Sequence, residues 1–166
     1  MQIVIDTREK KPWSFPPDVS IEFATLKAGD YALKNDSRFA IERKSGEDLA
    51  GTLSSGWERF LREIKRMEEY QFESKIIIVE ADFEYFCFKC KNGIILPPDH
   101  EHVRCSPQFL MKRISELSFM NVSVLFAGNI QLASALAFKI FIEREKRLKN
   151  EDLVKQALLL HEENIL

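Results

Sequence analysis

The run KIIIVEA, residues 75–81, constrains the fold most, because apolar side chains occupy consecutive positions in it. Successive side chains of a strand point to opposite faces of a sheet, so a strand that is apolar throughout is covered on both faces. We therefore expect helices on either side of a sheet that has this strand near its centre. A chain of 166 residues, 45% of them hydrophobic, is long enough to form one domain of this kind around its own core.

Strand signals dominate the first part of the chain, and strands alternate with helices after it. We expect the first strands to form hairpins, with Ile21 and Phe23 facing the core. Strands are predicted, in chain order, over residues 2–6, 21–26, 27–33 (after a turn at Gly29), 38–44, 75–81 and 121–127. Helices are predicted over residues 45–53, 55–70, 107–119 and 130–148, and a separate amphipathic segment over 151–166. This order is typical of the α/β class, with a mixed sheet and helices on both of its faces.

Charge and cysteine content limit the possible partners and compartment. The net charge of −2 shows no overall basic bias, so a polyanionic partner would have to meet local basic patches. Three cysteines cannot all pair, and no signal peptide opens the sequence, so we expect a reducing, cytoplasmic environment. The most apolar stretch, residues 130–142, contains Gln131, Ser134 and Lys139 and is too short to span a bilayer, so we expect no membrane association.

Acidic residues gather where the predicted strands end. In FAIERK, residues 39–44, strand alternation places Glu42 and Lys44 on the same face. Asp30 opens the strand that pairs with this one through a short polar turn, so a hairpin brings Asp30 back towards Glu42. Asp6 ends the first strand and can reach the same edge. The sequence therefore predicts a cluster of three carboxylates and one ammonium group.

Carboxylates that lie this close repel one another unless a cation neutralises them. Mg²⁺ or Mn²⁺ accepts oxygen ligands and keeps several waters, and such an ion can activate water and polarise a phosphoryl oxygen. A lysine beside it can orient the attacking water or stabilise developing charge. The set is suited to phosphodiester hydrolysis. The alternative interpretation is a surface hairpin that ends in ordinary ion pairs.

The order of these motifs resembles the XPF-type structure-specific endonuclease domain. The family signature is Gly-Asp, a variable gap, Glu-Arg-Lys, three residues and Asp, preceded by a strand that ends in Val-Asp-x-Arg-Glu. The corresponding residues here are Ile5-Asp6-Thr7-Arg8-Glu9, Gly29-Asp30, Glu42-Arg43-Lys44 and Asp48. The segments SSGWERFLREIKRM, IIIVEA, SVLFAGN and IEREK are similar to later parts of the family domain, in the same order.

The resemblance implies a restriction-endonuclease-like mixed central sheet flanked by helices. It also implies cleavage of DNA, dependent on Mg²⁺ or Mn²⁺, near branches, flaps or junctions. Asp6, Asp30 and Glu42 would bind the metal and Lys44 would lie at the reacting phosphate. Arg8, Arg43 and Asp48 match positions important for activity or for shaping the site.

The resemblance further bears on architecture and partners. We expect a nuclease domain over residues 1–149 and a helical tail over 150–166 that has no helix-hairpin-helix module, as in stand-alone phage or bacterial relatives. A phage-encoded chain would act in the host cytoplasm. Family members dimerise through their nuclease domains, so we expect a homodimer. Two alternatives stay open: a Holliday-junction resolvase or exonuclease that uses the same site, and a non-catalytic DNA-binding subunit.

Several of these residues have a second interpretation. Asp48 can complete a capping box with Ser45 at a helix start, act in the site, or do both. Arg43 points away from Lys44 by strand alternation, and can pair with an acidic neighbour to brace the site. We interpret Glu9 as a loop residue rather than a metal ligand.

A basic stripe on the predicted helix 55–70 offers a contact for phosphates. Arg59, Arg62 and Arg66 recur at helical spacing, and Arg59 is the best candidate for substrate binding because it is nearest the helix start. An ordinary solvated face, offset by Glu58 and Glu63, explains the stripe equally well.

A zinc site is a weaker possibility. Potential ligands follow one another at Cys87, Cys90, His100, His102 and Cys105. Their spacing fits no standard zinc finger, so we favour a variable connection without metal.

Overall fold

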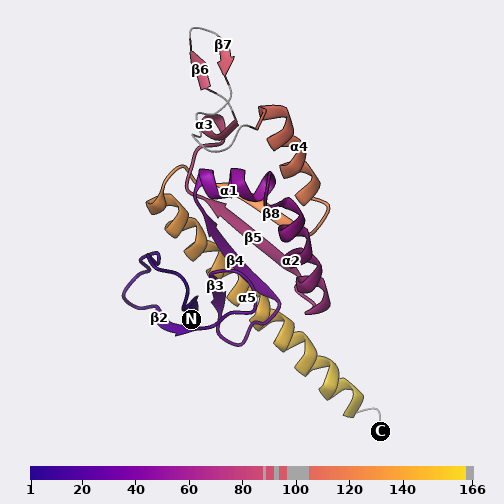
Figure 1. Ribbon diagram of the computed structural model, residues 1–166. Coiled ribbons are helices and arrows are strands. Elements are labelled where there is room, and N and C mark those ends of the chain that lie inside the picture. Colours follow the sequence, from indigo (N-terminus) through magenta and orange to yellow (C-terminus); the bar gives the residue numbers. More distant parts are fainter. Residues whose placement is uncertain (88, 92–93, 97–104, 164–166) are drawn as a thin grey trace.

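In the computed structural model a mixed sheet lies between helices on its two faces (Figure 1). The structure describes residues 1–87, 89–91, 94–96 and 105–163. Its main-sheet strands are β1 (Gln2–Asp6), β2 (Ser20–Ala24), β3 (Tyr31–Leu33), β4 (Phe39–Lys44), β5 (Ser74–Val79) and β8 (Val122–Phe126). Its helices are α1 (Gly46–Leu53), α2 (Trp57–Glu69), α3 (Phe83–Cys87), α4 (Pro107–Leu117) and α5 (Ile130–Glu163). A separate hairpin joins β6 (Lys89–Lys91) to β7 (Ile94–Leu96).

The main sheet has the strand order β2-β1-β3-β4-β5-β8. The inner pairs β1–β3 and β3–β4 are antiparallel, whereas β4–β5 and β5–β8 are parallel. β5 therefore has a neighbour on each side, which confirms the central position predicted from its apolar sequence. The parallel strands β4 and β5 end at the same edge, and that edge carries the Glu42–Lys44 segment.

One strand pairing differs from expectation. β1 and β2 are parallel rather than a hairpin, because the long loop of residues 7–19 carries the chain back to the start of the sheet. The expected inward orientation of Ile21 and Phe23 is also wrong. β2 is an edge strand, and Phe23 is 58% exposed there.

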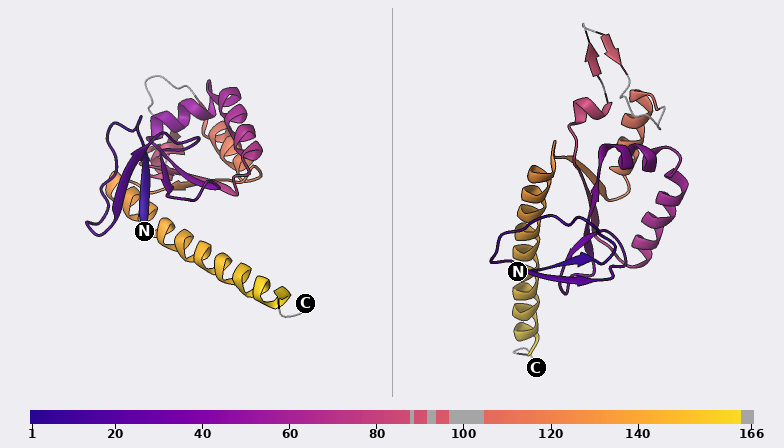
Figure 2. Two further views of the ribbon diagram at one scale, coloured as in Figure 1. Left: turned by 90° about the horizontal axis from the view of Figure 1, so that it is seen from below. Right: turned by 60° about the vertical axis from the view of Figure 1, so that its left-hand side comes forward.

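Two apolar cores cover the two faces of the sheet. Helices α1, α2 and α4 pack on one face, where Leu53, Phe60 and Leu110 meet Ile77 of β5. Helix α5 packs on the other face together with the loop after β1; this core contains Trp13, Tyr31, Phe39, Ile41, Ile78, Ala137 and Phe141. Both views in Figure 2 show α5 on one side of the sheet and α1 and α2 on the other. The cores confirm that successive β5 side chains are buried on opposite faces.

The last helix is longer than expected. Instead of a helix over 130–148 and a separate segment, α5 continues unbroken from Ile130 to Glu163. Its final turns extend past the sheet (Figure 2), and Leu153 and Val154 are exposed there. The helix passes through the expected domain boundary at residue 149, which stays a prediction. Among the described residues, none of the helices is both long and apolar enough to cross a membrane.

Candidate active site

The end of β4 carries the central pair of the site. Glu42 and Lys44 share one face of the strand, as alternation predicts, and Lys44 Nζ lies 3.1 Å from Glu42 Oε1. Both side chains are partly buried beneath the layer formed by α1 and α2. The pair thus places an ammonium group and a carboxylate at the edge where β4 ends.

Asp30 joins this pair through the turn that precedes β3. The amide of Asp30 donates to the Ile41 carbonyl at 2.9 Å, and the amide of Arg43 donates to Asp30 Oδ2 at 2.9 Å. Tyr31 pairs with Ile41 in antiparallel register, so Asp30 comes next to Glu42, as the hairpin argument predicts. Asp30 Oδ1 has no hydrogen bond to another described residue and stays available to a ligand.

The turn depends on Gly29. Its φ of +72° lies in the left-handed region, which glycine adopts without strain. A Cβ at this position would come within 2.8 Å of Ala40 Cβ and 3.0 Å of the Ile41 carbonyl oxygen. Gly29 and the small side chain of Ala40 therefore let β3 and β4 approach closely enough to bring Asp30 to Glu42.

Burial and a neighbouring negative charge perturb Asp30. Desolvation, followed by repulsion from Glu42, raises the pKa of Asp30 from 3.8 to about 6, although the Arg43 amide opposes the shift. This is the behaviour expected of a carboxyl pair that lacks a neutralising cation. A raised carboxyl pKa in an acidic cluster is also typical of functional sites.

Asp6 lies at the same end of the sheet, but its carboxylate is already occupied. It is 1% exposed, and Oδ1 accepts from Arg8 N at 2.8 Å and from Arg8 Nε at 2.7 Å. Oδ2 accepts from Arg8 Nη2 at 2.9 Å and from Leu26 N at 2.8 Å. These bonds, led by the Arg8 side chain, lower the pKa of Asp6 to about 2. In this arrangement Asp6 anchors Arg8 and the loop after β1, and it would have to release Arg8 to bind a metal.

Arg43 points to the opposite face and braces the site, as strand alternation predicts. Arg43 Nε donates to Glu80 Oε1 at 2.8 Å and Nη2 to Glu80 Oε2 at 3.1 Å. Nη1 lies 3.3 Å from Glu9 Oε1 and also donates to the Lys11 carbonyl. Arg43 therefore ties β4 to the end of β5 and to the N-terminal loop. Glu9 takes part in this brace as a loop residue.

Ser45 caps α1, since its Oγ accepts from Asp48 N at 3.1 Å. The Asp48 carboxylate accepts from the Ser45 hydroxyl at 2.8 Å, rather than from the Ser45 amide as in a capping box. Asp48 therefore takes part in the helix start, and a catalytic role stays a prediction.

A cleft beside this cap connects the site to α2. The cleft has a volume of about 490 Å³, and its walls include Lys44, Asp48 and Arg59. Of the three arginines in the α2 stripe, Arg59 lines this cleft, whereas Arg62 and Arg66 do not. The geometry therefore selects the residue that we expect to bind substrate.

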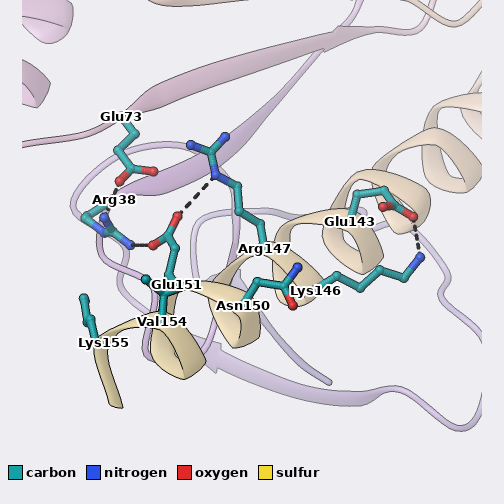
Figure 3. Close-up of a pocket in the computed structure, with 9 residues that line it drawn as sticks. All are labelled: Arg38, Glu73, Glu143, Lys146, Arg147, Asn150, Glu151, Val154 and Lys155. Carbon is teal, nitrogen blue, oxygen red and sulfur yellow. Dashed lines mark hydrogen bonds and ion pairs between the residues drawn. The ribbon is translucent and has the colours of Figure 1, made fainter. Parts of the chain in front are cut away.

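A larger cavity, of about 820 Å³, lies at the opposite end of the parallel strands (Figure 3). Arg38 and Glu73, which precede β4 and β5, form its walls with residues 143–155 of α5. Most of its charged side chains form ion pairs with one another, for example Arg38 with Glu151 at 3.0 Å. The cavity is therefore separate from the site.

Sequence reasoning missed two charged neighbours of the site. Glu80 directly follows the apolar run of β5, and this position signals that it reaches the same edge as Glu42. Lys75 is the second residue of β5 and is 1% exposed beneath α2, with Nζ 3.8 Å from Glu42 Oε2. No sequence signal identifies Lys75, because its place depends on the parallel register that pairs it with Ala40.

The donors fit a small divalent ion only in part. Within the described part of the chain, no group of three or more His, Cys, Asp or Glu side chains is arranged to hold a metal. Asp30 and Glu42 do form an adjacent carboxylate pair, and Mg²⁺ is commonly held by one or two carboxylates with waters completing its shell. The pair therefore fits Mg²⁺ or Mn²⁺, whereas Asp6 does not in its present pairing.

The zinc hypothesis falls mostly outside the described residues. His100 and His102 are not described, and neither are the side chains of Cys87 and Cys90. Cys105 is a free cysteine.

Fold and site together define a nuclease-type α/β domain, and comparison with known proteins assigns its family. The ERCC4 domain model matches residues 5–140, so the chain belongs to the ERCC4 domain family. This confirms the resemblance to the XPF-type nuclease domain and the predicted fold class. No functionally curated protein sequence matches the chain.

Solved structures support the same fold. The chain is similar to XPF from Aeropyrum pernix, with a TM-score of 0.64 and 20% identity over 90% of this chain and 68% of that chain. It is also similar to XPF from Aeropyrum pernix in complex with DNA, with a TM-score of 0.54 and 23% identity over 83% of this chain and 65% of that one.

Proposed function

We propose that this chain is a divalent-metal-dependent DNA endonuclease that hydrolyses phosphodiester bonds at branched, flap or junction DNA. The observation that carries the proposal is the adjacency of Asp30, Glu42 and Lys44 at one sheet edge of an ERCC4 domain. The similarity to an XPF structure with bound DNA supports DNA as the substrate.

Asp30 and Glu42 are the residues that would hold Mg²⁺ or Mn²⁺. Such an ion supplies Lewis-acid stabilisation and a more acidic bound water. Asp30 contributes its free Oδ1, since Oδ2 is held by the Arg43 amide. Glu42 contributes Oε1 when Lys44 turns from it towards the scissile phosphate.

Lys44 and Arg59 bind and orient the substrate in this proposal. Lys44 Nζ orients the attacking water and stabilises the negative charge that develops on the phosphate. Arg59 holds a neighbouring phosphate across the cleft that both side chains line. The attack then occurs at the end of β4, with the DNA backbone running along the start of α2.

The remaining motif residues keep this arrangement rigid. Arg43 fixes the end of β4 through Glu80, and Arg8 orders the loop after β1 through Asp6. Asp48 bonds to the N-cap Ser45 at the start of α1 and forms part of the cleft wall. We assign these residues to shaping the site, with Asp6 available as a ligand only if Arg8 moves to a phosphate.

A cleavage assay tests the proposal. Purified protein alone, with Mg²⁺, is incubated with labelled flap, fork, four-way and linear DNA. We expect cleavage near the junction of the flap or fork, no cleavage with EDTA, and loss of cleavage in Lys44→Ala without loss of fold. Lys112→Ala, which removes an exposed lysine of α4, is the matched control. Full activity in Lys44→Ala would refute the assignment.

The same panel separates other enzymes that could use this site. Preferred cutting of the four-way substrate would indicate a Holliday-junction resolvase. Progressive shortening of the linear duplex from its ends would indicate an exonuclease.

A non-catalytic DNA-binding subunit is the second candidate, and the pairing of Asp6 with Arg8 favours it. A carboxylate that accepts four hydrogen bonds leaves the site with two ligands rather than three. This candidate predicts DNA binding without nicking by the purified chain. It also predicts that Arg8→Ala does not gain activity.

A homodimer is the partner arrangement that the family resemblance implies. Sedimentation equilibrium tests it, and a monomer at high protein concentration would contradict it. The cytoplasmic location is tested by fractionation.

A further inference from the structure

Lys75 is the residue near the site that the proposed function leaves unexplained. Its side chain is 1% exposed, and lysine is among the residues least often buried without a partner. Lys75 Nζ donates to Glu63 Oε1 of α2, lies 3.8 Å from Glu42 Oε2, and lies 5.3 Å from the centroid of the Phe60 ring. The chain thus places a buried ammonium group between a helix and a proposed metal ligand.

Glu42 therefore lies between two ammonium groups, one at each oxygen. Lys44 Nζ is 3.1 Å from Oε1 and Lys75 Nζ is 3.8 Å from Oε2. The two lysines differ in freedom. Lys44 ends its strand at the cleft and can turn towards solvent, whereas Lys75 is enclosed by the α2 layer and held by Glu63.

We propose that Lys75 is a positioning residue that reserves Glu42 Oε2, so that Glu42 offers a divalent ion only Oε1. Glu63 keeps Lys75 in place and thereby connects α2, which also carries Arg59, to the metal ligand. The inference rests on the proposed metal site, because it concerns how many oxygens of Glu42 reach the ion.

Two substitutions have opposite expected effects on ion binding. Lys75→Met keeps an unbranched side chain that is one atom shorter, but it removes a positive charge and frees Oε2, so binding of Mn²⁺ tightens by about threefold to tenfold. Glu63→Gln removes the carboxylate that competes with Glu42 for Lys75. Lys75 then shifts to Glu42, and binding of Mn²⁺ weakens by about threefold. A lysine with a purely structural role would not give shifts of opposite sign.

Mn²⁺ alone, without DNA, is the probe. Free Mn²⁺ is measured by electron paramagnetic resonance to give the affinity, and water-proton relaxation gives the number of exchanging waters on the bound ion. In Lys75→Met we expect one water fewer than in wild type, because Glu42 then binds through both oxygens. Lys65→Met, which removes an exposed lysine of α2 two residues from Glu63, is the control and leaves both quantities unchanged.

Cleavage measured at saturating Mn²⁺ gives a second readout. Lys75→Met is expected to cut at least about tenfold more slowly despite its tighter binding, because Glu42 is no longer held in one orientation. If the wild-type chain binds Mn²⁺ and the variants shift as expected but nothing is cleaved, the proposed nuclease function fails and the positioning role stands.

Three outcomes overturn the positioning role. The first is an unchanged water number in Lys75→Met, and the second is a shift of the two affinities in the same direction or not at all. The third is a wild-type chain that does not bind Mn²⁺, which overturns the proposed metal site as well. Should Lys75→Met fail to fold, Glu63→Gln decides, since unchanged Mn²⁺ affinity in that variant contradicts the role of Lys75.

Discussion

Two aspartates at the same end of the sheet have opposite protonation behaviour. Hydrogen bonds, led by those from the Arg8 side chain, lower the pKa of Asp6 to about 2, whereas burial and Glu42 raise that of Asp30 to about 6. Environments that separate the pKa values of neighbouring acids commonly separate their roles. Asp6 is the structural anion of this pair, and in the proposed site Asp30 is the one that would receive a cation.

The pKa of Asp30 predicts a pH dependence of stability in the metal-free protein. Because the folded pKa of about 6 exceeds the ordinary 3.8, the folded state takes up the proton first as the pH falls. This stabilisation is complete below about pH 4 and is lost as the pH rises through 6. We expect the unfolding free energy of wild type, relative to Asp30→Asn, to fall by about 2 kcal/mol between pH 4.5 and 7.5.

Urea unfolding at the two pH values measures this difference. Asp18→Asn, at an exposed loop position, should track wild type throughout. Equal pH dependence in wild type and Asp30→Asn would contradict the prediction.

Gly29 gives a second prediction. Gly29→Ala adds a Cβ at 2.8 Å from Ala40 Cβ with φ at +72°, so we expect a loss of about 2–3 kcal/mol in unfolding free energy and weaker binding of Mn²⁺. Gly51→Ala is the control. Nothing lies within 4 Å of a Cβ there, and alanine inside α1 should add about 0.5–1 kcal/mol. Thermal and urea unfolding compare the two, and an undisturbed Gly29→Ala would show that the turn tolerates a side chain.

Sequence predicted the arrangement of the candidate site residues better than it predicted their hydrogen-bond partners. Alternation was sufficient to place Glu42 with Lys44 and to send Arg43 to the other face, since it depends only on strand geometry. The four hydrogen bonds that the Asp6 carboxylate accepts were not predictable, because they depend on how the loop after β1 folds back onto it.

At the scale of elements, α2 joins the core to the cleft. Trp57, Phe60, Ile64 and Met67 recur at helical spacing and form its buried face, and this packing fixes which arginine lines the cleft. The arginine stripe alone did not distinguish a phosphate contact from a solvated face. The structure distinguishes Arg59 from the other two arginines, because α1 lies next to the start of α2 and forms a cleft there that Arg59 lines.

This selection predicts unequal effects along the stripe. We expect Arg59→Ala to weaken DNA binding by about tenfold and to reduce the slope of log affinity against log salt concentration by about one, because one phosphate contact is lost. Arg66→Ala, on the same helix but outside the cleft, should leave both quantities unchanged. Fluorescence anisotropy at several salt concentrations measures them, and equal losses in the two variants would favour a diffuse basic face.

Strand and helix positions were largely predictable, whereas connections were less so. The mixed sheet and the cap at Ser45 match expectation, because patterning and capping are local signals. The direction of β2 and the continuity of α5 did not match. The direction of β2 depends on the path of the long loop 7–19, and α5 continues past the sheet without the break that was expected.

At the scale of the whole molecule, a buried ion pair attaches α5 to the sheet. Arg144 is 7% exposed, and its Nε lies 2.7 Å from Asp36 Oδ2, while Nη1 lies 2.6 Å from Glu73 Oε2. Asp36 belongs to the turn between β3 and β4, so the pair joins the last helix to the strands that carry the site. It does so at the end of the strands opposite Glu42 and Lys44.

Removal of Arg144 should therefore destabilise the domain without altering the site. We expect Arg144→Met to lower the unfolding free energy by about 3–5 kcal/mol, because Asp36 is left buried and unpaired. Lys146→Met, an exposed lysine of the same helix, should change it by less than about 0.5 kcal/mol. Urea unfolding provides the comparison, and Mn²⁺ affinity should be the same in both variants at a temperature where both are folded.

The two tryptophans lie on opposite faces of the sheet, so their fluorescence reports on each face separately. Trp13 stacks on Tyr31 at 4.5 Å, and its Nε1 donates to Glu80 Oε1 at 2.6 Å, the same carboxylate that holds Arg43. Trp57 lies on the other side of the sheet. Emission from a Trp57→Phe chain would thus follow the brace behind the site, so rearrangement of that brace could be timed without any attached label.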